Sequence, residues 1–462
     1  MKKTMSNGGI KMRISLNDPS IRAKLEEVCR MYAWYPELLA ETECTEWEQL
    51  PLLTDRRLLP YYERGEGSAQ PEWNVYRTSG TSGRKRKAIY YDAFDENVYL
   101  SHKTELFGRL LKNLPQGSAV LSDMGTGHAE ATAAAVFEQL GFVCESIPFG
   151  LPASMHLMKL SECRPDVLYT MPSLLDGLFR IAPDGFQWGL QKVLLVGEPA
   201  PPAWRKRAAE LLGLAEADIL DTYGSIEIGT IAYYDIDLKK YVLLEGLIAE
   251  GASPTEVGLP GVELPEGECV LVLTSLVRRR FPALRFVTYD VVRGLRTEQA
   301  EDGSWITTFE AVVKRIGPEL KHGEKISVYD IENAVFQHLK QAEVKVLVKN
   351  NRLRITIDAG ALVDDAVRAL IRAELHGAIP EIGAMIRGGL LEEMDVRFTE
   401  GEELAAITAA AKSKPKATEL EVVPAAPLKR KKLYIDLSDT EDDNEKAGSH
   451  GAKGKIGDDR SR

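Results

Sequence analysis

The sequence predicts an α/β protein with a large N-terminal domain of parallel α/β layers, an antiparallel barrel-like layer and a small α+β C-terminal domain. Three observations in the 462-residue chain support this prediction. From about residue 92 to 220, short apolar runs alternate with helical segments, which is typical of parallel strands buried on both faces. From 219 to 310, short β-type runs are separated by turns. After 314–318, strands and helices alternate again in a smaller unit.

Composition and charge restrict the class of protein. Hydrophobic residues make up 44% of the chain, which is ordinary for a globular protein, and the net charge of −11 argues against a protein that coats nucleic acid. No run of about 18 apolar residues is present, so we expect no membrane span. The basic start of the chain lacks the apolar stretch of a secretory signal. We therefore expect a cytoplasmic protein that is a monomer or a homodimer.

The cysteines carry no recognisable motif. They are five in number and scattered, at Cys29, Cys44, Cys144, Cys163 and Cys269. Because no pair has the spacing of a metal or redox site, we predict reduced, mostly buried thiols. A catalytic cysteine is the less favoured alternative, since none lies in an activating context.

The chain begins with predicted helical structure. Apolar residues at mixed three- and four-residue spacing indicate helices over 13–65. Pro51 and the residues after it interrupt this pattern, and Thr54 or Asp55 is the predicted N-cap of the helix that follows.

A loop rich in hydroxyls, glycines and cations follows at 76–87, before a predicted strand at 88–91. Its central residues are Thr78, Ser79, Gly80, Thr81, Ser82 and Gly83, and four cations come next. Glycines let backbone N–H groups approach an anion, hydroxyls add donors and cations supply charge. The pattern of a Walker A loop is absent. A polar hairpin turn is the alternative that this loop alone leaves open.

Four short apolar runs predict the parallel strands, at 119–121, 142–144, 166–169 and 192–196, with an alanine-rich helix at 129–140. Ligands gather at the carboxyl ends of such strands. The residues there that we single out are Gly125, Gly127, His128, Pro172, Ser173, Gly197, Glu198 and Pro199. His128 would either bond a substrate or cap the next helix.

A second candidate motif opens the antiparallel region, whose predicted strands lie at 230–234, 241–244, 269–273 and 286–289. It consists of Asp221, Thr222, Tyr223, Gly224 and, three residues later, Glu227. An aromatic ring, a glycine and a carboxylate within five residues can stack a base, approach a phosphate and hold Mg²⁺. A strand turn with a surface glutamate is the alternative.

We divide the chain into a core domain at 1–315, a small C-terminal domain at 316–410, and a basic linker with a charged tail at 411–462. The tail is predicted to be disordered because its composition buries too little apolar surface.

The two motifs, in this order, resemble the adenylate-forming acyl ligase superfamily, which includes acyl-CoA synthetases and the adenylation domains of peptide synthetases. The sequence is most similar to the phenylacetate–CoA ligase branch, over about residues 50–335. The segments that carry the resemblance are 50–54, 78–83, 172–173, 197–199, 223–227, 281–290, Arg315, 320–321 and 323–326.

The resemblance implies a role for each motif. The hydroxyls of 78–83 would contact the phosphates of ATP, and Glu227 would hold Mg²⁺. Asp290 would bind the ribose, with Tyr223 and 197–199 around the adenine and Arg315 directed toward the nucleotide. The acid would lie between 122–128 and 169–173. The small C-terminal domain would move as a lid that brings in a lysine.

This chain departs from the family pattern at four places. No proline follows the phosphate loop, Tyr289 stands where relatives have glycine, and Gly317 stands where they have aspartate. The C-terminal lysine has three candidates, Lys412, Lys414 and Lys416, of which we prefer Lys416.

The resemblance implies activation of a small-molecule carboxylic acid, aromatic by analogy with the branch, as an acyl-adenylate with release of pyrophosphate. The acyl group would then pass to coenzyme A. Transfer to an acyl carrier protein or to an amine is an alternative that the sequence leaves open. A non-catalytic nucleotide-binding relative is a further alternative, supported by the missing hinge aspartate and opposed by Glu227 and Asp290.

Overall fold

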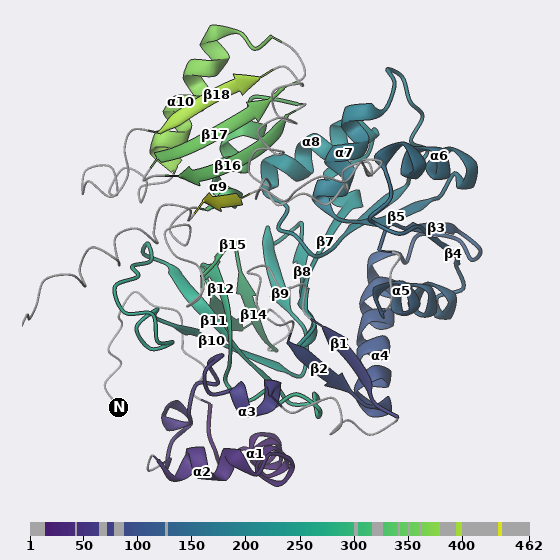
Figure 1. Cartoon of the computed structure of the whole chain (residues 1–462). Helices are drawn as coiled ribbons and strands as arrows, with labels where there is room; N and C mark the ends of the chain where they lie inside the picture. Colours follow the sequence, from purple (N-terminus) through teal and green to yellow (C-terminus); the bar gives the residue numbers. More distant parts are fainter. Residues whose placement is uncertain are drawn as a thin grey trace, which may run out of the picture.

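The computed structural model of the chain describes residues 14–41, 44–63, 72–77, 87–124, 128–299, 304–316, 327–340, 342–349, 352–359, 362–378, 394–399 and 433–436. These residues form a mixed α/β core and a separate small C-terminal domain, as predicted (Figure 1). The C-terminal domain lies at one end of the core, and the N-terminal helices lie at the opposite end.

The N-terminal region is broken into short helices. They are α1 (Pro19–Met31), α2 (Trp34–Ala40), the 3-10 helix η1 (Trp47–Gln49) and α3 (Leu59–Tyr62). Thr54 and Asp55 are not the N-cap of α3, which begins at Leu59, but the Thr54 hydroxyl accepts from the N–H of Arg57 at 3.4 Å in the turn that precedes this helix. The preceding segment instead pairs with the core: the N–H of Leu53 donates to the carbonyl of Arg285 at 2.9 Å. This pairing with a strand keeps the segment extended.

The largest sheet has nine strands in the order β13-β14-β9-β8-β7-β6-β5-β3-β4. Its parallel strands are β3 (Ala119–Ser122), β4 (Val143–Ser146), β5 (Val167–Thr170), β6 (Lys192–Leu195) and β7 (Ile219–Ser225). Its antiparallel strands are β8 (Gly229–Asp235), β9 (Lys240–Leu243), β13 (Arg296–Gln299) and β14 (Trp305–Phe309). The sequence predicted parallel pairing for β3, β4, β5 and β6, and this is confirmed.

The predicted antiparallel layer is divided between two sheets. Strands β8 and β9 extend the parallel sheet, because β7 pairs in parallel with β6 on one side and forms a hairpin with β8 on the other. A separate four-stranded antiparallel sheet contains β10 (Leu247–Ala252), β11 (Glu268–Ser275), β12 (Phe286–Arg293) and β15 (Ala311–Arg315). A short pair, β1 (Asn74–Arg77) and β2 (Ala88–Tyr91), flanks the predicted phosphate loop.

Helices cover both faces of the parallel strands. They are α4 (Ala93–Leu110) and α5 (His128–Gln139) on one face, and α6 (Ala153–Cys163), α7 (Pro172–Ile181) and α8 (Pro202–Leu212) on the other. Successive residues of a strand point to opposite faces. Val167 and Tyr169 of β5 accordingly pack with α4 and α5, whereas Leu168 packs with the other helices. Both faces must therefore be apolar, which explains the continuous apolar runs. Only the edge strand β4 departs, with Val143 60% exposed.

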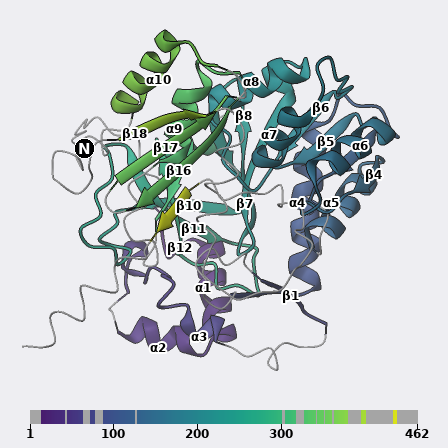
Figure 2. The same ribbon diagram turned by 45° about the horizontal axis from the view of Figure 1, so that its top comes forward.

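The small domain contains a four-stranded sheet in the order β18-β17-β16-β19. Its elements are α9 (Val328–Phe336), β16 (Glu343–Lys349), β17 (Arg352–Asp358), α10 (Asp365–Ala378), β18 (Asp395–Thr399) and β19 (Leu433–Asp436). This sheet is separate from the nine-stranded sheet (Figure 1), and it comes to the front of the molecule in Figure 2.

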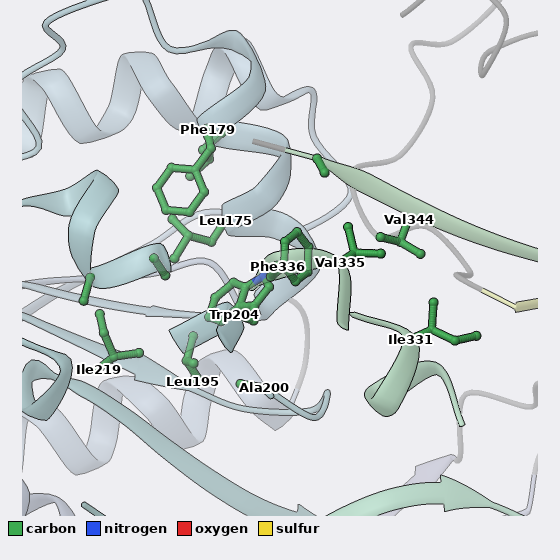
Figure 3. Close-up of a cluster of buried hydrophobic side chains, with 14 of the residues drawn as sticks. Leu175, Phe179, Leu195, Ala200, Trp204, Ile219, Ile331, Val335, Phe336 and Val344 are labelled. Carbon is green, nitrogen blue, oxygen red and sulfur yellow. The ribbon is translucent and has the colours of Figure 1, made fainter. Parts of the chain in front are cut away.

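Helix α9 packs against α8 of the core. Figure 3 shows Phe336 of α9 directed toward Trp204 of α8 and Val335 beside Val344 of β16, within one buried cluster. The ring of Phe336 also lies 4.5 Å from the guanidinium carbon of Arg207, whose Nε donates to the carbonyl of Lys340. A rotation of the small domain as a lid would have to open this contact.

Four residues of the segment predicted to be a basic linker form a strand in the structure. Leu433–Asp436 form β19, which pairs in parallel with β16. In the sequence, the only signal is an apolar triplet between a basic and an acidic run. β19 therefore belongs to the sheet of the small domain, beyond the predicted end of that domain at residue 410.

We expect truncation after Lys432 to lower the melting temperature by roughly 2–5 °C. Loss of β19 removes several interstrand hydrogen bonds, each contributing about 1 kcal/mol, and exposes an edge of β16. Truncation after Asp436 is the matched control and should leave the melting temperature unchanged. Thermal unfolding followed by circular dichroism tests both chains. Equal melting temperatures would show that β19 contributes nothing to stability.

The cysteines are less buried than the sequence predicted. None of the five cysteines is in a disulfide, and all are half-buried where we expected mostly buried ones. Burial raises the pKa of Cys144 and of Cys269 to about 11, which disfavours the reactive thiolate.

None of the helices in the described part of the chain combines the length and apolarity needed to cross a membrane.

Candidate active site

Three of the predicted site residues meet where the two large sheets adjoin. The phenol of Tyr223, on β7, donates to Asp290 Oδ2 at 2.6 Å. Asp290 on β12 faces Arg315 on the paired strand β15, and Arg315 Nη1 lies 3.6 Å from Asp290 Oδ1. The side chain of Arg315 is 60% exposed, whereas that of Asp290 is 13% exposed. The cluster thus presents a cation to solvent above a carboxylate held in place by a phenol.

Neighbouring charges and burial set the protonation states of Arg315 and Tyr223. Asp290 raises the pKa of Arg315, and Glu227 and Asp55 add to this effect, so the guanidinium stays charged. Burial, followed by the charge of Asp290, raises the pKa of Tyr223, so its phenol stays protonated and can donate. Asp55 was predicted only as a helix cap. Its Oδ2 accepts a hydrogen bond from Lys87 Nζ at 2.7 Å, and Lys87 comes just after the predicted phosphate loop.

Glu227 lies in the turn between β7 and β8. Its backbone carbonyl accepts a hydrogen bond from Arg278 Nε at 3.1 Å, and the preceding carbonyl, of Ile226, accepts one from the phenol of Tyr91 at 2.8 Å. Arg278 is itself buried, pairs with Asp95 and stacks on the ring of Tyr91 at 3.6 Å. The turn is therefore anchored from behind, which fixes the start of the Glu227 side chain. Sequence reasoning missed Arg278.

The fit of Glu227 to Mg²⁺ can be tested on its surroundings. Within the described residues, no group of three or more His, Cys, Asp or Glu side chains is arranged to hold a metal ion. Mg²⁺ is commonly held by one or two carboxylates together with phosphate oxygens and water. Glu227, whose charge acts on both Tyr223 and Arg315, would meet that requirement if phosphates bind at this cluster.

Three other residues of the same motif are engaged elsewhere. The Asp221 carboxylate accepts a hydrogen bond from Tyr241 and lies 3.5 Å from Arg205 Nη1. The Thr222 hydroxyl donates to the carbonyl of Leu195 at 2.8 Å. A Cβ on Gly224 would lie 2.6 Å from the carbonyl oxygen of Gly229, so only glycine fits this hairpin. Neither the Asp221 nor the Thr222 side chain forms a hydrogen bond with the Tyr223–Asp290–Arg315 cluster.

We expect the contribution of Asp221 to stability to decrease as pH rises from about 4 to 6. Burial raises its pKa from 3.8 to about 6, against the opposing effects of Arg205 and Tyr241. The folded state therefore binds the proton more tightly than the unfolded state, and stability is lost as pH rises through this window, by up to about 3 kcal/mol. Urea unfolding of the wild type and of Asp221→Asn isolates this group, and the stability difference between the two proteins should fall from pH 4 to pH 6. A constant difference would contradict the raised pKa.

The ends of β5 and β6 are joined by Glu198. The backbone N–H and the hydroxyl of Ser173 donate to the Glu198 carboxylate at 2.9 and 2.8 Å. Pro172 begins α7, so Glu198 satisfies an N-terminal donor of this helix and interacts well with its dipole. Gly197 has a φ of +80°, a conformation that favours glycine. The structure thus brings these four predicted residues, with the adjacent Pro199, to one edge of the sheet.

The backbone of Tyr289 adopts a conformation that favours glycine, which is the residue that the family resemblance led us to expect at this position. Its φ is +61°, in the left-handed region that is unfavourable for a side chain. The ring is buried in the core of the second sheet, and its phenol oxygen accepts from the N–H of Asp55 at 3.4 Å. Packing therefore compensates for the strain next to Asp290.

A buried pair that sequence reasoning missed lies at the end of β3. Asp123 Oδ1 and His156 Nδ1 are 2.9 Å apart, and neither side chain is exposed. Because 33 residues separate them and His156 lies on α6, no local pattern signals the pair. It borders the segment predicted to bind the acid.

The remaining predicted residues, or their side chains, lie outside the part of the chain that the structure describes. Those outside the described residues are Thr78, Ser79, Gly80, Thr81, Ser82, Gly83, Gly125, Gly127, Lys412, Lys414 and Lys416. His128 is the first residue of α5, and its side chain is also outside the description.

Comparison with known proteins gives one family match and one curated relative. A model described as the fumarate–diaminopropanoate ligase C-terminal domain matches residues 321–400. The chain is 31% identical over 382 residues to fumarate–(S)-2,3-diaminopropanoate ligase of Enterobacter agglomerans. This match covers 82% of the chain and 95% of the relative.

Solved structures share the fold. 2-Hydroxyisobutyryl-CoA ligase in the postadenylation state with 2-HIB-AMP has a TM-score of 0.61 and 17% identity, over 94% of this chain and 94% of that chain. The same ligase with 2-HIB-AMP and CoA in the thioesterification state has a TM-score of 0.51 and 16% identity, also over 94% of each chain. At these identities the likeness establishes the fold alone.

Proposed function

The chain belongs to the adenylate-forming ligase superfamily, and we propose that it activates a small carboxylic acid with ATP and then joins the acyl group to an amine. The observation that carries this proposal is the Tyr223–Asp290–Arg315 cluster. It combines a fixed carboxylate for hydroxyls with an exposed cation for phosphate, as an adenylating site requires. The anchored turn of Glu227 adds a position for a metal.

The chemistry needs positioning more than covalent participation by the protein. A carboxylate oxygen of the acid attacks the α-phosphate, the bond to the β-phosphate oxygen breaks, and pyrophosphate leaves. Asp290 would accept hydrogen bonds from the ribose hydroxyls, and Arg315 would compensate the negative charge on the phosphates. Glu227 would hold Mg²⁺, which supplies further compensation of phosphate charge. In the second step the amine nitrogen attacks the acyl carbon, AMP leaves, and the amine loses a proton.

The identity of the relative favours an amine as acceptor and a dicarboxylic acid as substrate. Its name describes the joining of fumarate to (S)-2,3-diaminopropanoate. Coenzyme A is the second candidate acceptor, in keeping with the resemblance to the phenylacetate–CoA ligase branch. An aromatic acid remains a prediction of that resemblance and belongs in the same test.

The decisive experiment is ATP–pyrophosphate exchange over fumarate, succinate, crotonate, benzoate and phenylacetate. Active acids are then incubated with ATP and either (S)-2,3-diaminopropanoate or coenzyme A, and the products are identified by mass spectrometry. Exchange with amide formation supports the proposal, and thioester formation favours coenzyme A. Absence of exchange with every acid would favour the non-catalytic alternative.

A further inference from the structure

Lys103 on α4 is a buried cation without an acidic partner. Its Nζ donates to the phenol oxygens of Tyr169 at 3.0 Å and Tyr99 at 3.3 Å. It also lies over the rings of Tyr99, Phe107 and Tyr169, at 5.1–5.4 Å from their centroids. Within the described part of the chain, no carboxylate lies within ion-pair distance of it.

The other buried cations behave differently. Each buried Lys or Arg elsewhere in the described ranges lies within 4.0 Å of a carboxylate. These pairs are Lys24–Glu27, Arg205–Asp221, Arg207–Asp176, Arg278–Asp95, Arg285–Glu250 and Lys345–Glu343. Removing an ammonium from water without a counter-charge costs several kcal/mol, which phenol oxygens and ring faces offset only in part. The site of Lys103 therefore favours an anion.

The surroundings of Lys103 connect it to the proposed acid site. Tyr169 lies in 169–173, one of the two segments between which the acid is predicted to bind, and its carbonyl accepts from the N–H of Asp123. Tyr99 is one helical turn from Lys103 on α4, so both share a face. The ring of Tyr99 lies 2.9 Å from where a Cβ on Gly229 would be. Gly229 is two residues after Glu227, so the Lys103–Tyr99 pair lies directly behind the Glu227 turn.

A small cavity borders Tyr99, whose phenol oxygen accepts from Lys103, although Lys103 itself is not among the residues that line it. Its walls include Tyr99 and His102 of α4 and Ile228 and Thr230 of the hairpin. An acid with its reacting carboxylate near the nucleotide would extend its other end toward these residues. In Figure 1, α4 runs alongside α5 and the β1–β2 pair, and it also contacts strand β8 of the hairpin.

We propose that Lys103 binds the second, non-reacting carboxylate of a dicarboxylic acid and thereby determines which acid is activated. This inference rests on the proposed function and adds to it the residue that selects the substrate class. A dicarboxylate would supply the counter-charge that the folded chain lacks at Lys103. A monocarboxylic acid, aromatic or aliphatic, would leave the ammonium uncompensated.

The test compares fumarate with crotonate, in which a methyl group replaces the second carboxylate. We expect wild-type kcat/KM for exchange to favour fumarate, and Lys103→Met to lower the fumarate-to-crotonate ratio at least about tenfold. Lys103→Arg keeps the charge and should keep most of the preference. Lys24→Met, at a buried lysine that has an acidic partner, is the matched control and should leave the ratio unchanged. An unchanged ratio in Lys103→Met would overturn the assignment.

Two further measurements keep the outcomes separate. If Lys103→Met does not fold, Tyr99→Phe removes one hydrogen-bond acceptor of the ammonium and should shift the same ratio. Fumarate should raise the melting temperature of the wild type more than crotonate does, even in the absence of turnover. No exchange with any acid would contradict the proposed function, whereas equal use of fumarate and crotonate by an active wild type would contradict only the role of Lys103.

Discussion

Glu227→Gln is expected to lower ATP–pyrophosphate exchange at least about 10²-fold while the protein remains folded. The substitution keeps the size and polarity of the side chain but removes the charge that would hold Mg²⁺ at the phosphates. Loss of a metal contact in such a site removes several kcal/mol of transition-state stabilisation. The turn itself should persist, because Arg278 and Tyr91 bond to backbone carbonyls that the substitution leaves in place.

The measurement is initial-rate exchange with the best acid, at saturating and limiting Mg²⁺, alongside thermal unfolding. Glu245→Gln is the matched control, since Glu245 is an exposed glutamate in another strand connection, between β9 and β10. It should exchange at the wild-type rate. If Glu227→Gln unfolds normally and retains more than about a tenth of the wild-type exchange rate, Glu227 is not the residue that holds Mg²⁺.

The parallel half of the fold was predictable because its signals are local. Each of the strands β3, β5 and β6 is a continuous apolar run, as burial on both faces requires. The division of the antiparallel strands between two sheets was not predictable. Periodicity indicates which face of a strand is buried, but it does not identify the neighbouring strand, and β7 pairs differently on its two sides.

The motif around Tyr223 shows how a contiguous pattern can mislead within a strand. Thr222 points to the opposite face of β7 from Tyr223 and bonds to β6. Asp221 shares the face of Tyr223 but lies two residues deeper, where Tyr241 and Arg205 surround it. Only Tyr223 reaches Asp290, so a motif of adjacent residues divides into one that faces the site and two that hold the sheet together.

The residues that sequence reasoning missed share one property: their meaning depends on a distant partner. Arg278 acts on the Glu227 turn from 51 residues away. Lys103 is informative only because no carboxylate of the described residues accompanies it, and a sequence does not show an absent partner. By contrast, Tyr223 and Asp290 were found through the order of motifs along the chain, although 67 residues separate them.

The family resemblance predicts that a C-terminal lysine completes the site, and a three-way substitution series tests which lysine it is. We expect Lys416→Ala to lower adenylation at least about 10²-fold, the usual scale for a positioned charge at a reacting oxygen. Lys412→Ala and Lys414→Ala, in the same basic run, are the controls. Ligation that starts from pre-formed adenylate should be much less affected, because that half-reaction involves no attack on a phosphate. Exchange and ligation are therefore measured separately for each variant.

The α8–α9 contact adds a structural condition to this prediction. If the small domain moves as a lid to bring in the lysine, the packing of Phe336 against α8 must change during turnover. A large loss in one variant alone assigns the lysine, and a similar loss in its neighbour would mean that the run acts through its charge. Wild-type exchange in all three variants would show that the run is a solvated linker. Lys325, in the segment that resembles the family hinge, would then be the next residue to substitute.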